Sequence, residues 1–275
     1  VLFLPSLFAW SVSALKEPWY FLTMSIGLAA AVTAGRPGPL MNRIGAVALL
    51  GACALTAQSI REGGLAMASA GAAAGLALGL IARRPRLAAA LVVAALLIVP
   101  FIVTRGTFKD RVVKGVREVA AVHWGHVNTP GYVYTVLDGS FYMRRAAINE
   151  MTVRQGVRYV VGSIAAYIAM PLPWKIQSRT ALAYLPEQLV WYLMVALAPI
   201  GVAAGLRRDA LLTSLLVCYT AIAVVLVALT SGNIGTLVRH RGLAVPYMLW
   251  LSTLGACEVL AWIRLSVGDA HADHR

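Results

Sequence analysis

Long hydrophobic runs separated by short polar segments dominate this chain of 275 residues. A helix of roughly 17–25 apolar residues is long enough to cross the ~30 Å hydrocarbon core of a bilayer. We predict seven such spans, at about 19–34, 44–60, 65–82, 87–103, 187–206, 210–230 and 243–263. The pattern therefore predicts an all-α fold: a polytopic membrane helix bundle of about seven spans, forming a single membrane domain over 1–275.

One stretch, 105–155, interrupts this pattern because it is polar and mixed in charge. It contains two turn-forming sequences, Asn-Thr-Pro-Gly at 128–131 and Asp-Gly at 138–139. Its residues 112–124 have the apolar spacing of a helix, whereas 132–136 are β-branched and aromatic but too few for an independent sheet. We interpret 105–155 as one long extracytoplasmic loop within the membrane domain.

The segment that follows, 152–170, is amphipathic, with Arg154 and Arg158 one helical turn apart and apolar residues beyond them. This arrangement fits an interfacial or re-entrant helix that ends before Pro171. A spanning helix at this place would move every later loop to the other side of the membrane.

Glycines recur every four residues in the third apolar run, at Gly71, Gly75 and Gly79. Such a row of small residues lets a second helix approach the backbone closely, and lipid cannot replace the van der Waals contact that results. We therefore expect this face to pack against another helix.

Basic residues are concentrated in four connectors that seven spans would place on one side: 36–43, 83–86, 207–208 and the tail after Arg264. The positive-inside rule makes that side cytoplasmic. The long polar loop and the basic hinge Arg239-His240-Arg241 then lie on the outer side. Positive charge on the outer side is not explained by topology, and it favours a function there.

The composition agrees with a membrane protein, since 60% of the residues are hydrophobic and 13% are charged. The formal net charge is +13, but the arginines cluster at the ends of apolar runs, which indicates membrane lipids and no nucleic acid as partners. Each of Cys53, Cys218 and Cys257 lies inside an apolar run without CxxC spacing, so we expect neither a disulfide framework nor a metal site. No cofactor is predicted.

The most informative segment is 229–247, where an apolar run breaks at Ser231-Gly232-Asn233 and Arg239-His240-Arg241 precede the next run. Guanidinium groups at the end of a span are costly to desolvate, so they lie in water or pair with an anion, and phosphate matches their geometry.

Two motifs carry a resemblance. Residues 4–17 match L-P-S-x-x-x-W-S…K-[DE], and 233–246 match N-x-G-T-x-x-R-x-R…P; Pro-Leu-Pro-Trp at 171–174 forms a third shared stretch. The chain thereby resembles bacterial oligosaccharide-repeat or O-antigen polymerases and lipid-dependent glycosyltransferases of the GT-C type. Those enzymes generally carry an acidic residue in an outer loop after an early span. We expect the chain to be either a divergent member or the C-terminal part of a longer enzyme.

The resemblance implies a polyprenyl-phosphate or polyprenyl-diphosphate-linked saccharide as substrate. It also implies a reaction at the outer face of the bacterial cytoplasmic membrane and polysaccharide-assembly proteins as partners. An alternative is a non-catalytic membrane carrier or flippase-like component of polysaccharide export, in which the same arginines guide a phosphate headgroup.

Transfer from such a donor needs cations that neutralise the leaving diphosphate and a base that accepts a hydroxyl proton. Three acids are candidates for the base, and each has an ordinary structural role as an alternative, as a turn former, ion-pair partner or helix N-terminal carboxylate: Asp138, Glu150 and Glu187. The predicted substrate-binding residues are Arg239, His240, Arg241, Lys16 and Asn233.

Overall fold

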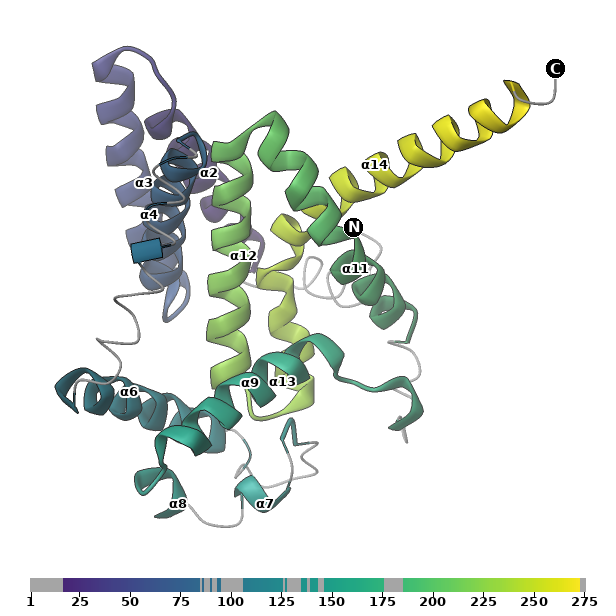
Figure 1. Cartoon of the computed structure of the whole chain (residues 1–275). Helices are drawn as coiled ribbons and strands as arrows, with labels where there is room; N and C mark the ends of the chain where they lie inside the picture. The colour runs from purple at the N-terminus through teal and green to yellow at the C-terminus, as the bar shows by residue number, and fades with distance from the viewer. Residues whose placement is uncertain are drawn as a thin grey trace. The chain divides into compact units, whose positions relative to one another are not determined.

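A computed structural model describes residues 17–84, 86, 90, 93–94, 106–125, 127, 135–137, 139–142, 146–175 and 185–272 (Figure 1). The helices are α2 (Glu17–Gly35), α3 (Leu40–Ile60), α4 (Gly64–Ala82), α6 (Gly106–Gly125), α7 (Gly139–Tyr142), α8 (Ala146–Asn149), α9 (Val153–Ala169), η1 (Pro173–Lys175), α11 (Leu185–Arg208), α12 (Ala210–Thr230), α13 (Ile234–His240), η2 (Arg241–Leu243) and α14 (Val245–Ala272). The described part of the chain is thus all-helical, as predicted, with one isolated β-bridge between Thr135 and Asn233.

Five helices are long and apolar enough to cross a membrane: α3, α4, α11, α12 and the part of α14 from Val245 to Leu265. They confirm five of the seven predicted spans and a multi-pass membrane protein. The predicted span at 19–34 is present as the helix α2 but is not among the five, because its first turn holds Glu17, Pro18 and Trp19 in place of aliphatic residues. The predicted span at 87–103 lies largely outside the described residues.

The chain divides into two compact units. The first consists of Val1–Arg83, Thr180–Ile222 and Leu243–Arg275, and the second of Arg84–Arg179 and Ala223–Gly242. The first unit holds α2, α3, α4, α11, α14 and most of α12. The second holds α6 to α9, the last turns of α12 and α13, so the predicted outer loop and the basic hinge belong to the same unit.

The predicted glycine face on α4 packs against α12 in the first unit. A Cβ atom placed on Gly75 would lie 2.7 Å from the Cα atom of Leu215, and one on Gly71 would lie 2.8 Å from the ring of Tyr219. Gly79 lies against Leu211 in the same way. Because the contacts move toward the start of α12 as they move toward the end of α4, the two helices run antiparallel. Tyr219 uses this approach to donate a hydrogen bond to the carbonyl oxygen of Ala68 at 3.1 Å. The expectation of close helix packing is therefore confirmed.

A second close contact joins α11 and α14. A Cβ atom on Gly201 would lie 1.7 Å from the carbonyl oxygen of Leu251, and one on Gly255 would lie 2.2 Å from that of Leu197. No side chain fits at either place, so each helix presents a glycine to the backbone of the other. The spans of this unit are thus held together chiefly by small residues that allow backbone contact, as expected in lipid.

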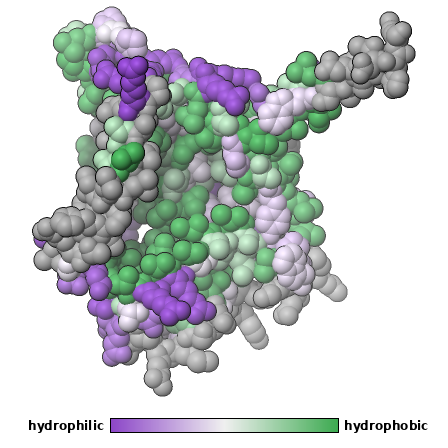
Figure 2. Space-filling model, in the orientation of Figure 1, coloured by the Kyte–Doolittle hydropathy of each residue, from purple (hydrophilic) through white to green (hydrophobic). Residues whose placement is uncertain are grey.

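Polar residues join the ends of these helices. Arg36, after α2, donates to the carboxylate of Asp209, between α11 and α12, at 2.5 Å, and Arg208 pairs with Glu258 of α14 at 3.1 Å. Burial raises the pKa of Asp209, but the backbone N–H of Leu212 and the Arg36 guanidinium outweigh it and hold the pKa below its usual range. Figure 2 shows hydrophilic residues gathered where α11 joins α12. The connectors at 36–43 and 207–208 therefore lie at the same end of the unit, as the predicted topology requires.

The second unit is built around the amphipathic helices α6 and α9. The predicted helices at 112–124 and 152–170 are both confirmed. Thr152 and Gln155 form a capping box that starts α9, and Met170 at its end precedes Pro171, which cannot continue a helix. Ala120, Ile148, Met151 and Tyr159 form the buried core between them. Arg117 of α6 also donates to the carbonyl oxygen of Met151 at 2.8 Å.

Candidate functional site

The basic hinge begins where α12 ends, at Ser231 and Gly232. A Cβ atom on Gly232 would lie 2.1 Å from the carbonyl oxygen of His123 on α6, so only glycine fits there. Its own carbonyl oxygen accepts a hydrogen bond from the backbone N–H of Val136 at 3.0 Å. The predicted outer loop therefore pairs with the end of α12, and its residue Thr135 forms the bridge to Asn233.

Asn233, predicted to bind substrate, caps the short helix that follows. Its Oδ1 accepts from the backbone N–H of Gly235 at 2.8 Å, and α13 then runs to His240 and continues into the turn η2. The hinge is therefore helical and not extended, because the break at Gly232 is followed at once by a capping residue. Arg241 is the first residue of that turn.

That turn leaves the two arginines in different environments. Arg239 is exposed on α13 and His240 is partly buried, whereas Arg241 is only 5% exposed. The Nε of Arg241 donates to the carbonyl oxygen of Tyr167 at 3.0 Å, and its Nη2 donates to the carbonyl oxygens of Tyr167 and Met170. Arg241 thus satisfies backbone acceptors at the end of α9 that the helix leaves without intrahelical donors.

Next to the break at Gly232 lie a buried histidine, His123, and a half-buried tyrosine, Tyr142. His123 of α6 is fully buried, and its Nε2 is 2.9 Å from the hydroxyl of Tyr142. That hydroxyl also accepts from the backbone N–H of Leu137 at 3.2 Å and lies 3.4 Å from the carbonyl oxygen of Gly232. Together these contacts tie α6, α7 and the outer loop to the end of α12.

Aromatic packing reinforces this cluster. The His123 ring stacks on Tyr142 and meets Phe141 and Tyr159 edge to face. Burial raises the pKa of Tyr142 to about 12 despite the hydrogen bonds that its hydroxyl accepts from backbone N–H groups, and burial also raises the pKa of Tyr159. Both phenols are therefore neutral at physiological pH and act as hydrogen-bond donors. Tyr159 donates to the carbonyl oxygen of Leu229, in the last turn of α12.

The predicted catalytic acids that the structure describes, Glu150 and Glu187, belong to different units. Glu150 is exposed between α8 and α9 in the second unit, and Glu187 lies in the first turn of α11 in the first unit. Asp138 and Lys16 lie outside the described residues. Their assignment as base or phosphate contact stays a prediction. Among the described residues, no group of three His, Cys, Asp or Glu side chains is placed to hold a metal ion.

Sequence reasoning missed two features of this region. The contact of Arg241 with Tyr167 and Met170 joins residues more than 70 positions apart, and the contact of His123 with Tyr142 depends on how the outer loop folds back. The available signal was the break Ser231-Gly232-Asn233 itself. A glycine directly before a capping asparagine indicates that another backbone lies close by, but not which one.

Comparison of the chain with family models, with curated proteins and with solved structures finds no match.

Proposed function

We propose that this protein is a membrane glycosyltransferase or polymerase that acts on a polyprenyl-(di)phosphate-linked saccharide at the outer face of the bacterial cytoplasmic membrane. The observation that carries the proposal is the position of Arg239, exposed on a short helix directly after the span α12 and fixed there by the buried Arg241. A guanidinium group at the end of a span is well suited to the phosphate of a lipid carrier.

In this proposal the two arginines have different roles. Arg239, with His240 beside it, contacts the phosphate, whereas Arg241 positions the hinge by binding the end of α9. Without this anchor α13 would lose its connection to α9, and Arg239 would lose its fixed place. The resemblance carried by residues 233–246 favours the same substrate class.

The proposed reaction forms a bond between an acceptor hydroxyl oxygen and the anomeric carbon of the donor sugar. The bond between that carbon and the phosphate oxygen breaks, and the diphosphate leaves with its charge stabilised by Arg239. The hydroxyl proton passes to a carboxylate, for which Glu150, Glu187 and Asp138 are the candidates. Other polysaccharide-assembly proteins would supply the lipid-linked substrate.

Photo-crosslinking tests the substrate class. The purified protein in lipid nanodiscs is irradiated with a polyprenyl phosphate that carries a photoactivatable group, and the modified residues are mapped by mass spectrometry. We expect labelling of α13 that an Arg239→Ala variant reduces, while Arg207→Ala, an exposed arginine at the end of α11, leaves it unchanged. Equal labelling of both variants would contradict the proposal. Labelling without saccharide transfer would instead favour a non-catalytic carrier.

A further inference from the structure

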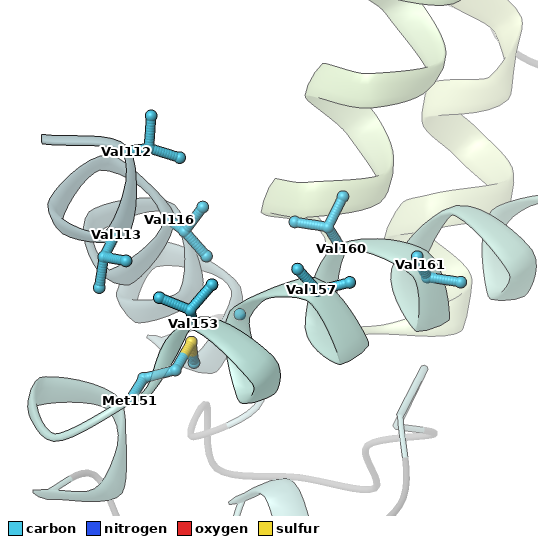
Figure 3. A pocket seen from close by; sticks show the side chains of 9 residues that line it. Val112, Val113, Val116, Met151, Val153, Val157, Val160 and Val161 are labelled. Carbon is cyan, nitrogen blue, oxygen red and sulfur yellow. The ribbon is translucent and has the colours of Figure 1, made fainter. Parts of the chain in front are cut away.

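The amphipathic helices α6 and α9 enclose an apolar groove that the proposed reaction does not use. It has a volume of about 200 Å³ and is lined by valines, one methionine and one glycine. Figure 3 shows Val116 of α6 and Val160 of α9 pointing toward one another across it. No polar side chain lines this groove, so it offers contact to hydrocarbon and no hydrogen-bonding partner.

Part of the groove's apolar lining is exposed as a stripe along α9. Val153, Val157 and Val161, at intervals of four residues, are 39%, 58% and 61% exposed, and they lie on one face of the helix. Val112 of α6 adds to this surface with 48% of its area exposed. A protein in water would rarely leave such a row uncovered.

Basic side chains border the stripe. Arg154 and Arg158 are exposed and alternate with the valines of α9, and Lys109 and Lys114 are exposed on α6. The two helices together carry six basic and two acidic residues. Figure 2 shows hydrophobic and strongly hydrophilic residues side by side over α9. An apolar face bordered by arginine and lysine is the pattern of a helix that lies in the surface of an anionic bilayer.

The fold places this pattern at the membrane boundary. Tyr159, in the middle of α9, donates a hydrogen bond to the carbonyl oxygen of Leu229, and Leu229 is in the last turn of the span α12, which ends at Thr230. Since α12 crosses the bilayer, its last turn marks the depth at which the hydrocarbon core ends. The middle of α9 therefore lies at this depth.

We infer that α6 and α9 form a docking surface for the anionic phospholipids of the bilayer. The valine stripe enters the outer leaflet, the groove takes part of one acyl chain, and Arg154 and Arg158 contact phosphate headgroups. The surface holds the hinge and the end of α9 at a fixed depth. This inference does not depend on the proposed transferase activity, and it concerns membrane lipids and not the saccharide carrier.

Depth measurements test it. Single cysteines replace Val153, Val157 or Val161 in a full-length protein whose native cysteines are changed to alanine, and each is labelled with a fluorophore. The protein is reconstituted in phosphatidylcholine vesicles, with or without phosphatidylglycerol, that contain lipids brominated at different acyl positions. We expect all three labels to be quenched at the same shallow depth, and a label at Asn149→Cys, an exposed polar position at the end of α8, to be quenched least.

The alternatives give different results. A spanning α9 would place Val161 about 12 Å deeper than Val153, from the rise of ~1.5 Å per residue, and this gradient would overturn the inference. So would labels that only water-soluble quenchers reach.

The charge requirement has its own measurement. Each arginine near an anionic surface favours the bound state by about fivefold, so Arg154→Gln with Arg158→Gln should remove the extra quenching that phosphatidylglycerol produces. A control pair, Arg83→Gln with Arg207→Gln, removes the same charge from exposed positions in the other unit. This control should keep the extra quenching that phosphatidylglycerol produces. Equal quenching with and without phosphatidylglycerol in the parent protein would overturn the assignment of an anionic lipid.

Discussion

The guanidinium group of Arg241 lies over the ring of Tyr167, with its central carbon 5.5 Å from the ring centre, and donates from Nε to the carbonyl oxygen of the same residue. Arg241 therefore contacts the end of α9 in two ways. It lies over the aromatic ring of Tyr167, and it donates hydrogen bonds to the last backbone carbonyl groups. A guanidinium is suited to this position because it is planar, always charged and able to donate several hydrogen bonds in a fixed fork.

We expect Arg241→Ala to destabilise the protein by about 2–6 kcal/mol, because a buried acceptor left without a donor costs roughly 1–3 kcal/mol and Arg241 donates to two, the carbonyl oxygens of Tyr167 and Met170. Arg241→Lys should restore only part of the loss, since an ammonium group lacks the fork geometry. The measurement is the midpoint of thermal unfolding in detergent. Arg207→Ala, at an exposed position at the end of α11, is the control and should unfold near the parent temperature. An unchanged midpoint for Arg241→Ala would refute the anchoring role.

The glycines of α4 provide a second prediction. Gly75→Leu should lower the yield of folded protein strongly, because even a Cβ atom at this position would lie 2.7 Å from the Cα atom of Leu215. Gly51→Leu on α3, where nothing lies within 4 Å of an added Cβ atom, should be tolerated. Size-exclusion chromatography of both variants after membrane extraction makes the comparison. Equal yields would show that α4 and α12 do not pack at these residues.

The extent to which sequence predicted this structure differs between the two units. The sequence was sufficient to predict the close packing at Gly71, Gly75 and Gly79 and the apolar lengths of five helices, because lipid imposes simple rules on the helices that cross it. The roles of Arg241 and His123 could not be predicted in this way. Each is decided by a backbone far away in the sequence: an arginine beside a phosphate and one beside helix-terminal carbonyls have the same local sequence, and only the tertiary fold distinguishes them.

Labelling from the two sides of the membrane tests the topology. With the native cysteines replaced by alanine, Ser140→Cys in α7 should react with an impermeant maleimide added outside intact cells, whereas Asp209→Cys should react only after permeabilisation. The expectation follows from the positive-inside rule applied to the connectors that meet at the Arg36–Asp209 ion pair. Because Asp209→Cys breaks that ion pair, Arg207→Cys provides an independent second reporter. Reaction of Ser140→Cys and both reporters from the same side would contradict this topology.

The raised pKa of the half-buried Tyr142 predicts that stability depends on pH in the alkaline range. A phenol whose pKa is raised from 10.0 to about 12 in the folded protein contributes stability that is fully present below pH 10 and is lost as the pH rises toward 12. Tyr142→Phe, which has no proton to lose, should show a smaller loss over this range when unfolding midpoints are measured at several pH values. An identical pH profile for the two proteins would exclude a contribution from Tyr142.

The most direct measurement is saccharide transfer by Arg239 variants. Polyprenyl-diphosphate-linked saccharides isolated from the source cells are supplied to vesicles containing the parent protein, Arg239→Ala, Arg239→Lys or the control Arg207→Ala, with protein level and orientation checked in each. A charge-assisted hydrogen bond contributes roughly 1.5–3 kcal/mol, so we expect Arg239→Ala to lower transfer by about tenfold to a hundredfold. Arg239→Lys should fall between Arg239→Ala and the parent, because lysine keeps the charge that sets topology but loses the fork that binds phosphate. Full transfer by Arg239→Ala would contradict the proposed function.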